Sequence, residues 1–146
     1  MDKRQITPAY FVAPQIEAAD VAELAQSGFT RVICNRPDAE VPPGLQHDAI
    51  EAAAKSAGLE FVYHPLTHTT MTSENVTKHR ELAETASGPV LAYCASGTRC
   101  SIVWALGQAG ALGVDEIITA AHAAGYDLAN MRPTLEALAH QAATDL

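Results

Sequence analysis

Apolar and polar positions alternate along this chain in blocks that suit strands and helices in turn. Short apolar or β-branched runs predict buried strands at residues 10–13, 30–34, 60–64 and 90–93. Helical spacing of apolar residues predicts helices at residues 17–26, 47–57, 73–87, 101–109, 114–124 and 133–143. This alternation predicts an α/β fold, with a mostly parallel sheet flanked by helices on both faces.

Turn and cap residues support these boundaries. Gly28, Gly58 and Gly125 follow helical segments and suit helix ends, and Ser73 suits the N-cap of the helix that follows it. With 146 residues and 48% apolar content, the chain is long enough for one domain with a sizeable core. We therefore expect a single domain over residues 1–146.

The charge balance narrows the choice of partners. A formal charge of −8 argues against binding nucleic acid or an anionic membrane surface. Any small anion must then be bound by local geometry, because the overall field of the protein repels it. No apolar run is long enough to span a bilayer, so we expect a soluble, cytoplasmic protein.

Cysteine and histidine usage predicts neither a disulfide scaffold nor a metal site. The cysteines are Cys34, Cys94 and Cys100, a low and odd count. The six histidines are scattered, and the closest pair, His64 and His68, has no further ligand nearby in sequence. We expect no metal and no organic cofactor, and Cys34 is expected to be a core residue.

The segment GPVLAYCASGTRCS is the strongest candidate for chemistry, because it places a thiol and a guanidinium at the two ends of a short loop. Cys94 follows a buried strand, and Arg99 precedes an apolar helix. Ligands of such sheets collect at the carboxyl ends of the strands. The small residues between the two can curl so that backbone N–H groups point inward and bind an anion: Ala95, Ser96, Gly97 and Thr98.

This arrangement predicts an ionised nucleophile beside an anion-binding group. Inward N–H groups and the start of the following helix stabilise a thiolate and lower the pKa of Cys94. Gly97 permits a backbone conformation that other residues avoid. Arg99 can bind two oxygens of a tetrahedral anion. We therefore predict Cys94 and Arg99 as catalytic residues.

The second thiol of the segment has three possible roles. Cys100 can be an inert residue at the helix start, or it can donate a weak S–H hydrogen bond within the loop. It can also form a reversible disulfide with Cys94 and protect that thiol from over-oxidation. The sequence leaves these alternatives open.

The strand–CxxGxR–helix unit resembles the cysteine-dependent tyrosine and dual-specificity phosphatases. Together, YFVAPQI, TRVICNRPD and GPVLAYCASGTRCSIVWAL resemble the phosphatase-like domain of the bacterial beta-lactamase-hydrolase-like protein family. The resemblance covers about residues 7–139 and implies a dual-specificity-phosphatase-like fold. Members of that family carry the labels phosphatase or sulfur transferase, so the resemblance implies one of these two chemistries.

Three departures from the phosphatase pattern bear on the choice between phosphatase and sulfur-transfer chemistry. Four residues separate Cys94 from Arg99 where phosphatases have five, Tyr93 replaces a histidine, and Cys100 replaces a serine or threonine. The shorter loop resembles that of rhodanese sulfurtransferases. The first hypothesis is phosphomonoester hydrolysis through a phosphocysteine, and the second is sulfane-sulfur transfer through a Cys94 persulfide. A non-catalytic phosphate- or sulfate-binding module is the third.

The phosphatase hypothesis needs an acid for the leaving group, and dual-specificity phosphatases use an aspartate from a nearby loop. The corresponding segment, PLTHTTMTSENV, contains no aspartate. Candidates are Asp38, His68 and Glu74, each of which also has a plausible structural or solvent-exposed role. Arg36 is either a second anion contact or a solvated charge. The expected partner is a small anionic substrate or a phosphorylated molecule.

Overall fold

The computed structural model describes residues 1–144, and the last two residues of the expected domain lie outside the described part. Its centre is one five-stranded sheet in the order β1-β2-β5-β3-β4. The strands are β1 (Arg4–Thr7), β2 (Tyr10–Ala13), β3 (Arg31–Cys34), β4 (Glu60–Tyr63) and β5 (Val90–Tyr93). The predicted strands 10–13 and 90–93 are confirmed, and the other two differ by one residue at one end.

Strand β5 is the centre of the sheet and is buried along its whole length. It pairs in parallel with β2 on one side and with β3 on the other, so that Tyr93 aligns with both Ala13 and Cys34. Strand β1 was not predicted. It is a mostly polar edge strand, RQIT, that pairs antiparallel with β2 and carries an irregularity between Gln5 and Thr7. The sheet is therefore mixed, although all its other pairings are parallel, as predicted.

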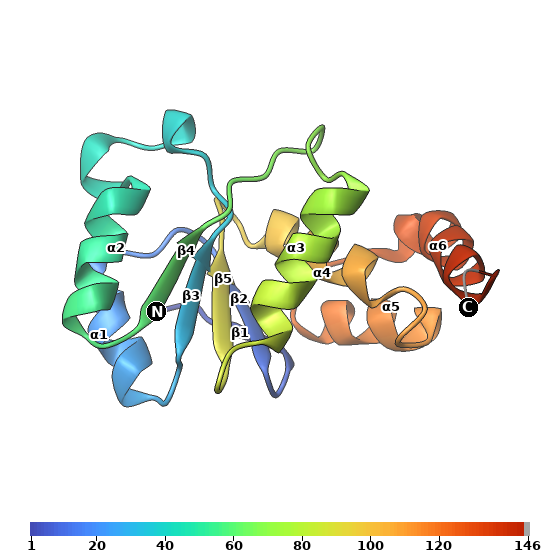
Figure 1. Cartoon of the computed structure of the whole chain (residues 1–146), viewed down its shortest axis with the longest axis horizontal. Helices are drawn as coiled ribbons and strands as arrows, with labels where there is room; N and C mark the ends of the chain where they lie inside the picture. The colour runs from blue at the N-terminus through green and yellow to red at the C-terminus, as the bar shows by residue number, and fades with distance from the viewer. Residues whose placement is uncertain (145–146) are drawn as a thin grey trace.

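Helices cover both faces of the sheet, which confirms the predicted layers (Figure 1). Helices α1 and α2 pack on one face, and α3, α4, α5 and α6 lie on the other. Their bounds are α1 (Ala18–Gln26), α2 (His47–Ser56), α3 (Ser73–Glu84), α4 (Thr98–Gln108), α5 (Val114–Ala123) and α6 (Arg132–Thr144). Within residues 1–144, every helix is too short or too polar to cross a lipid bilayer.

The N-cap of α3 and the start of α4 differ from the prediction, and the starts of α1 and α6 differ by one residue each. The N-cap of α3 is Thr72, whose hydroxyl accepts a hydrogen bond from the Asn75 N–H at 3.2 Å, and Ser73 is already helical. Helix α4 begins at Thr98, three residues earlier than expected. Its N-cap, Gly97, has a φ of 91°, a left-handed conformation that turns the chain directly from the loop into the helix. Arg99 and Cys100 consequently lie in the first helical turn.

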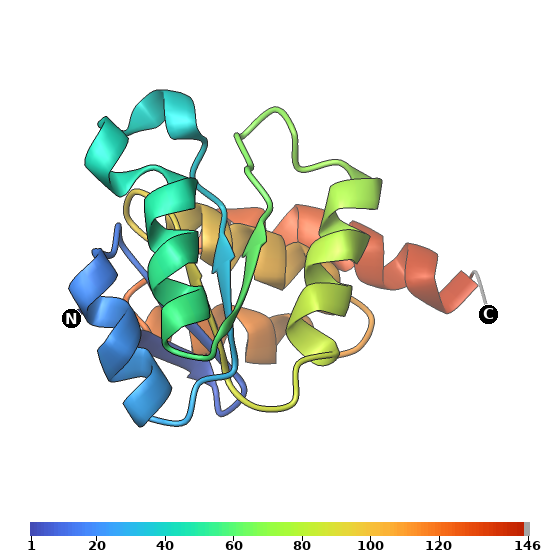
Figure 2. The ribbon, with the colours of Figure 1, turned by 60° about the vertical axis from the view of Figure 1, so that its left-hand side comes forward.

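The parallel strands all end at the same edge of the sheet, and three of the four connections there are described next. After β3 the chain passes through two short 3₁₀ turns, Asp38–Glu40 and Pro43–Leu45, before α2. After β4 it forms the long loop 64–72, and both connections project beyond the sheet at the top of Figure 2. The third connection is the tight loop between β5 and α4. This edge is where ligands of open α/β sheets bind.

The α1–α2 face of the core depends on Leu24, which has no exposed surface. Replacing Leu24 with alanine should lower the free energy of unfolding by about 2–5 kcal/mol, because it leaves a cavity beneath α1. Gln26→Ala, at an exposed position of the same helix, should change it by less than about 0.5 kcal/mol. Urea unfolding measures both values; equal effects would contradict this packing.

Candidate active site

The segment Cys94–Arg99, termed here the anion-binding loop, connects the central strand to the first turn of α4. Cys94 and Arg99 are buried, while Ala95 and Ser96 are exposed and Thr98 is half-buried. The sulfur of Cys94 therefore lies at the base of the loop, with exposed residues at its rim. The Gly97 N–H donates a hydrogen bond to Cys94 Sγ over 3.1 Å.

The surroundings of Cys94 favour its ionised form. The Cys100 thiol donates a hydrogen bond to the sulfur and contributes most to lowering its pKa. Burial opposes this effect, and the backbone N–H groups of Cys100, Ser96 and Gly97 add to the lowering. The net result is a pKa of about 5 for Cys94, so the thiol is a thiolate at neutral pH. This agrees with the inward N–H groups predicted from the sequence.

Cys100 is fully buried in the first turn of α4 and keeps its own proton. Burial, and next the hydrogen bond with Cys94, raise the pKa of the Cys100 thiol well above its usual value. All three cysteines are free and buried. Cys34 packs with the α1–α2 core and donates from Sγ to the Arg36 carbonyl at 3.4 Å, as expected for a core residue. A reversible disulfide between Cys94 and Cys100 remains a prediction.

Arg99 is held by a partner that sequence reasoning missed. Its Nη1 and Nη2 groups donate to the two carboxylate oxygens of Glu40 at 2.8 and 2.7 Å, and Nη1 also donates to the Leu66 carbonyl at 2.9 Å. The end of the guanidinium is thus occupied. Among the described residues no hydrogen bond engages Nε, so the side edge, Nε with one Nη2–H, remains for an anion.

Arg36 also contacts Glu40. It contacts the Glu40 carboxylate at 3.4 Å and the Glu40 carbonyl at 3.2 Å, and it donates to the Gln15 side chain at 3.2 Å. Arg99 is the main cause of a lowered pKa for Glu40, although partial burial opposes it. The structure thus places Arg36 next to the carboxylate that orients Arg99, and its role as a direct anion contact stays a prediction.

Asp38, an acid candidate, is engaged elsewhere. Its carboxylate accepts from the His47 N–H at 2.8 Å and pairs with the His47 ring nitrogen Nδ1, at the start of α2. Partial burial would raise the pKa of Asp38, but these two bonds and the attraction of His47 outweigh it and lower the pKa. An aspartate held ionised in this way is a helix cap and a poor proton donor at neutral pH.

The other two acid candidates are exposed. His68 lies in the turn of the loop that follows β4, and no side-chain hydrogen bond to it is found within residues 1–144. Glu74 lies in the first turn of α3, where a carboxylate suits the helix dipole. Neither contacts the anion-binding loop by a hydrogen bond in the described structure. The geometry therefore brings together Cys94, Arg99 and Cys100, and it leaves the acid unassigned.

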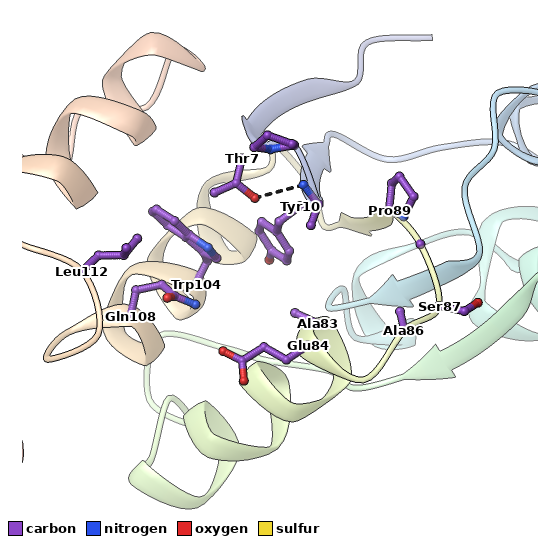
Figure 3. A pocket seen from close by; sticks show the side chains of 13 residues that line it. Thr7, Tyr10, Ala83, Glu84, Ala86, Ser87, Pro89, Trp104, Gln108 and Leu112 are labelled. Carbon is purple, nitrogen blue, oxygen red and sulfur yellow. Dashed lines mark hydrogen bonds between the residues drawn. The ribbon is translucent and has the colours of Figure 1, made fainter.

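Two hollows of the surface lie away from this loop. A pocket of about 640 Å³ lies at the amino ends of β2 and β5, where Tyr10 and Trp104 face Ala83 and Pro89 (Figure 3). A second, of about 540 Å³, lies among α3, α4 and α6. In the part of the chain that the structure describes, no group of three or more His, Cys, Asp or Glu side chains is placed to hold a metal ion.

Comparison with known proteins decides the family. The family described as "Beta-lactamase hydrolase-like protein, phosphatase-like domain" matches residues 2–111. The chain belongs to this family. A beta-lactamase hydrolase-like protein from Xylella fastidiosa (strain 9a5c) is 33% identical over 132 residues, which are 89% of this chain and 31% of that protein. The chain thus spans about a third of that relative's length.

Solved structures confirm the fold of this phosphatase-like domain. A Neisseria meningitidis Z2491 protein named a putative phosphatase is 36% identical, with a TM-score of 0.83, covering 94% of this chain and 99% of that one. TpbA of P. aeruginosa, solved as a cysteine-to-serine variant in complex with phosphotyrosine, matches with a TM-score of 0.66 at 18% identity, covering 97% and 90%. The dual-specificity-phosphatase-like fold expected from the resemblance is confirmed.

The ionisation of Cys94 can be measured without a substrate. The thiolate absorbance of the folded protein, recorded against pH, should show one transition with a midpoint near pH 5 that Cys94→Ser abolishes. Because the folded structure favours the charged form, the transition lies below the range of free cysteine, at about pH 8.5.

Matched substitutions at Cys100 test whether its thiol lowers the pKa of Cys94. Cys100→Ala removes the donor that contributes most, so the midpoint should rise, and Cys100→Ser should restore much of the shift because a hydroxyl donates in its place. A wild-type midpoint near that of free cysteine, or a Cys100→Ala variant with an unchanged midpoint, would contradict this assignment.

Proposed function

We propose that this phosphatase-like domain hydrolyses phosphomonoesters with Cys94 as the nucleophile. The observation that carries the proposal is the lowered pKa of Cys94 in a loop whose backbone N–H groups donate to its sulfur, together with the Arg99 guanidinium, whose charge interacts with that of Cys94. These are the donors that stabilise the equatorial oxygens of a transferring phosphoryl group.

The reaction runs in two displacements. The Cys94 thiolate attacks phosphorus, the S–P bond forms, and the ester P–O bond breaks with both electrons leaving on the alcohol oxygen. Water then attacks the phosphocysteine, the S–P bond breaks, and inorganic phosphate leaves with the thiolate restored. Backbone N–H groups and the free edge of Arg99 bind the phosphoryl oxygens in both steps.

The missing acid restricts the substrate class. Asp38 is paired with His47 and Glu40 with Arg99, and the pKa of each is lowered, so neither protonates a leaving oxygen at neutral pH. The alcohol must then leave as an anion that takes its proton from water. Aryl phosphates, whose phenoxides are stable, suit this site better than alkyl phosphates.

The same observation supports a second candidate. Sulfane-sulfur transfer needs no general acid: Cys94 attacks the outer sulfur of thiosulfate, the new S–S bond forms, and sulfite leaves. An acceptor such as cyanide then takes the outer sulfur and releases the thiolate. The loop of four residues between Cys94 and Arg99 is one residue shorter than in phosphatases. It also fits a persulfide sulfur, which is smaller than a phosphoryl group.

Parallel assays with one protein preparation separate these reactions. We expect release of phosphate from para-nitrophenyl phosphate, much slower release from an alkyl phosphate, and loss of both in Cys94→Ser. Thiocyanate formed from thiosulfate and cyanide, and lost in the same variant, would instead support sulfur transfer. A protein that binds phosphate but turns over neither substrate would be a non-catalytic anion-binding module and would overturn the proposal.

Glu40 provides a further kinetic test, because it orients Arg99 and also repels an incoming anion. Glu40→Gln should lower kcat for the aryl phosphate by about 10–100-fold, since Arg99 loses its paired contact. Inhibition by inorganic phosphate should stay equal or strengthen, since a negative charge is removed.

Glu84→Gln is the matched control, because Glu84 pairs with Arg80 on the exposed face of α3. It should change neither kcat nor phosphate inhibition. Equal losses of kcat and of phosphate affinity in Glu40→Gln would show that Glu40 does not act through the orientation of Arg99.

A further inference from the structure

One peptide group of the anion-binding loop connects the nucleophile to a residue far along the chain. The N–H end of the Ser96–Gly97 peptide donates to Cys94 Sγ at 3.1 Å. Its C=O end accepts a hydrogen bond from the Tyr126 hydroxyl at 2.9 Å. A trans peptide is planar, and its N–H and C=O point in opposite directions. Whatever fixes the carbonyl therefore fixes the direction of the N–H.

This peptide needs fixing, because glycine follows it. Gly97 has a φ of 91°, and a glycine can accept either orientation of the peptide before it at little cost. A rotated peptide would direct the Ser96 carbonyl, a negative dipole end, toward the Cys94 sulfur and would remove a donor from the thiolate. The neighbouring carbonyls are also held outside the loop: Ala95 by the Gln15 N–H at 3.4 Å, and Gly97 by Ser101 Oγ at 2.9 Å.

Tyr126 is itself fixed. It is 6% exposed, and its N–H donates to the Ala121 carbonyl at 2.9 Å, just beyond α5. The Arg4 guanidinium of β1 lies 5.2 Å from the centre of its ring, a cation–π contact. The hydroxyl also lies against Gly97, where an added Cβ would come within 2.1 Å of it. Burial raises the pKa of the Tyr126 hydroxyl, so it remains a proton donor at neutral pH.

We propose that Tyr126 is a positioning residue for the nucleophile: by holding the Ser96 carbonyl outside the loop, it keeps the Gly97 N–H directed at Cys94 Sγ. It acts through this peptide and does not touch the sulfur. Tyr126 lies outside residues 2–111, which match the family. The inference concerns the nucleophile on which the proposed function rests, but it can be tested on the thiolate alone.

The test compares Tyr126→Phe with Tyr63→Phe; Tyr63 is half-buried, and its hydroxyl accepts from the Asp38 N–H and from no group of the loop. The thiolate absorbance of each variant is titrated against pH. Tyr126→Phe should raise the Cys94 midpoint by roughly one unit, while Tyr63→Phe leaves it unchanged. An unchanged midpoint in a folded Tyr126→Phe variant would overturn the inference.

A measurement on the unaltered protein covers the case in which Tyr126→Phe does not fold. The ring carbon that bears the Tyr126 hydroxyl should change its NMR shift with the same midpoint as Cys94, because the shared peptide transmits the change in charge. The corresponding carbon of Tyr63 should not. A Tyr126 carbon shift that does not change through the Cys94 transition would contradict the inference. Neither experiment uses a substrate, so a failed phosphatase assay leaves both readouts intact.

Discussion

The hydrogen bond from the Gly97 N–H to Cys94 Sγ is the interaction on which the site depends. Cys94 directly follows the central strand β5 at the sheet edge, and α4 starts at Thr98. The backbone N–H groups of Ser96 and Cys100 also donate to the same sulfur. A negative charge buried without donors would be very unfavourable. Here the Cys100 thiol and the backbone N–H groups of Ser96, Gly97 and Cys100 donate to it, and the buried sulfur can therefore remain charged.

Arg99 adds the second constraint. Its guanidinium reaches across the sheet edge to Glu40 and to the Leu66 carbonyl, so the loops after β3 and β4 both define its orientation. Glu40 occupies the end of the guanidinium and leaves the side edge for an anion. The same engagement removes Glu40 from acid catalysis, as His47 removes Asp38. In the proposed reaction Cys94 is the nucleophile, and neither of these two carboxylates supplies a proton to the leaving group.

Local patterns predicted most of the fold and the geometry of the loop from Cys94 to Arg99. The apolar run before Cys94 predicted β5, and the small residues up to Arg99 predicted inward N–H groups. What the sequence could not show depends on contacts between distant segments. Arg99 and Glu40 are 59 residues apart, and Tyr126 is 30 residues from Ser96. Strand β1 was missed because an edge strand with polar residues lacks the apolar signal of a buried one.

The most direct test of this account is the backbone NMR shift of the Gly97 amide as a function of pH. If that N–H binds the Cys94 thiolate, its shift should follow a single transition near pH 5, and the transition should vanish in Cys94→Ala. An amide signal that does not change through this range in the unaltered protein would show that the loop does not stabilise the nucleophile as described.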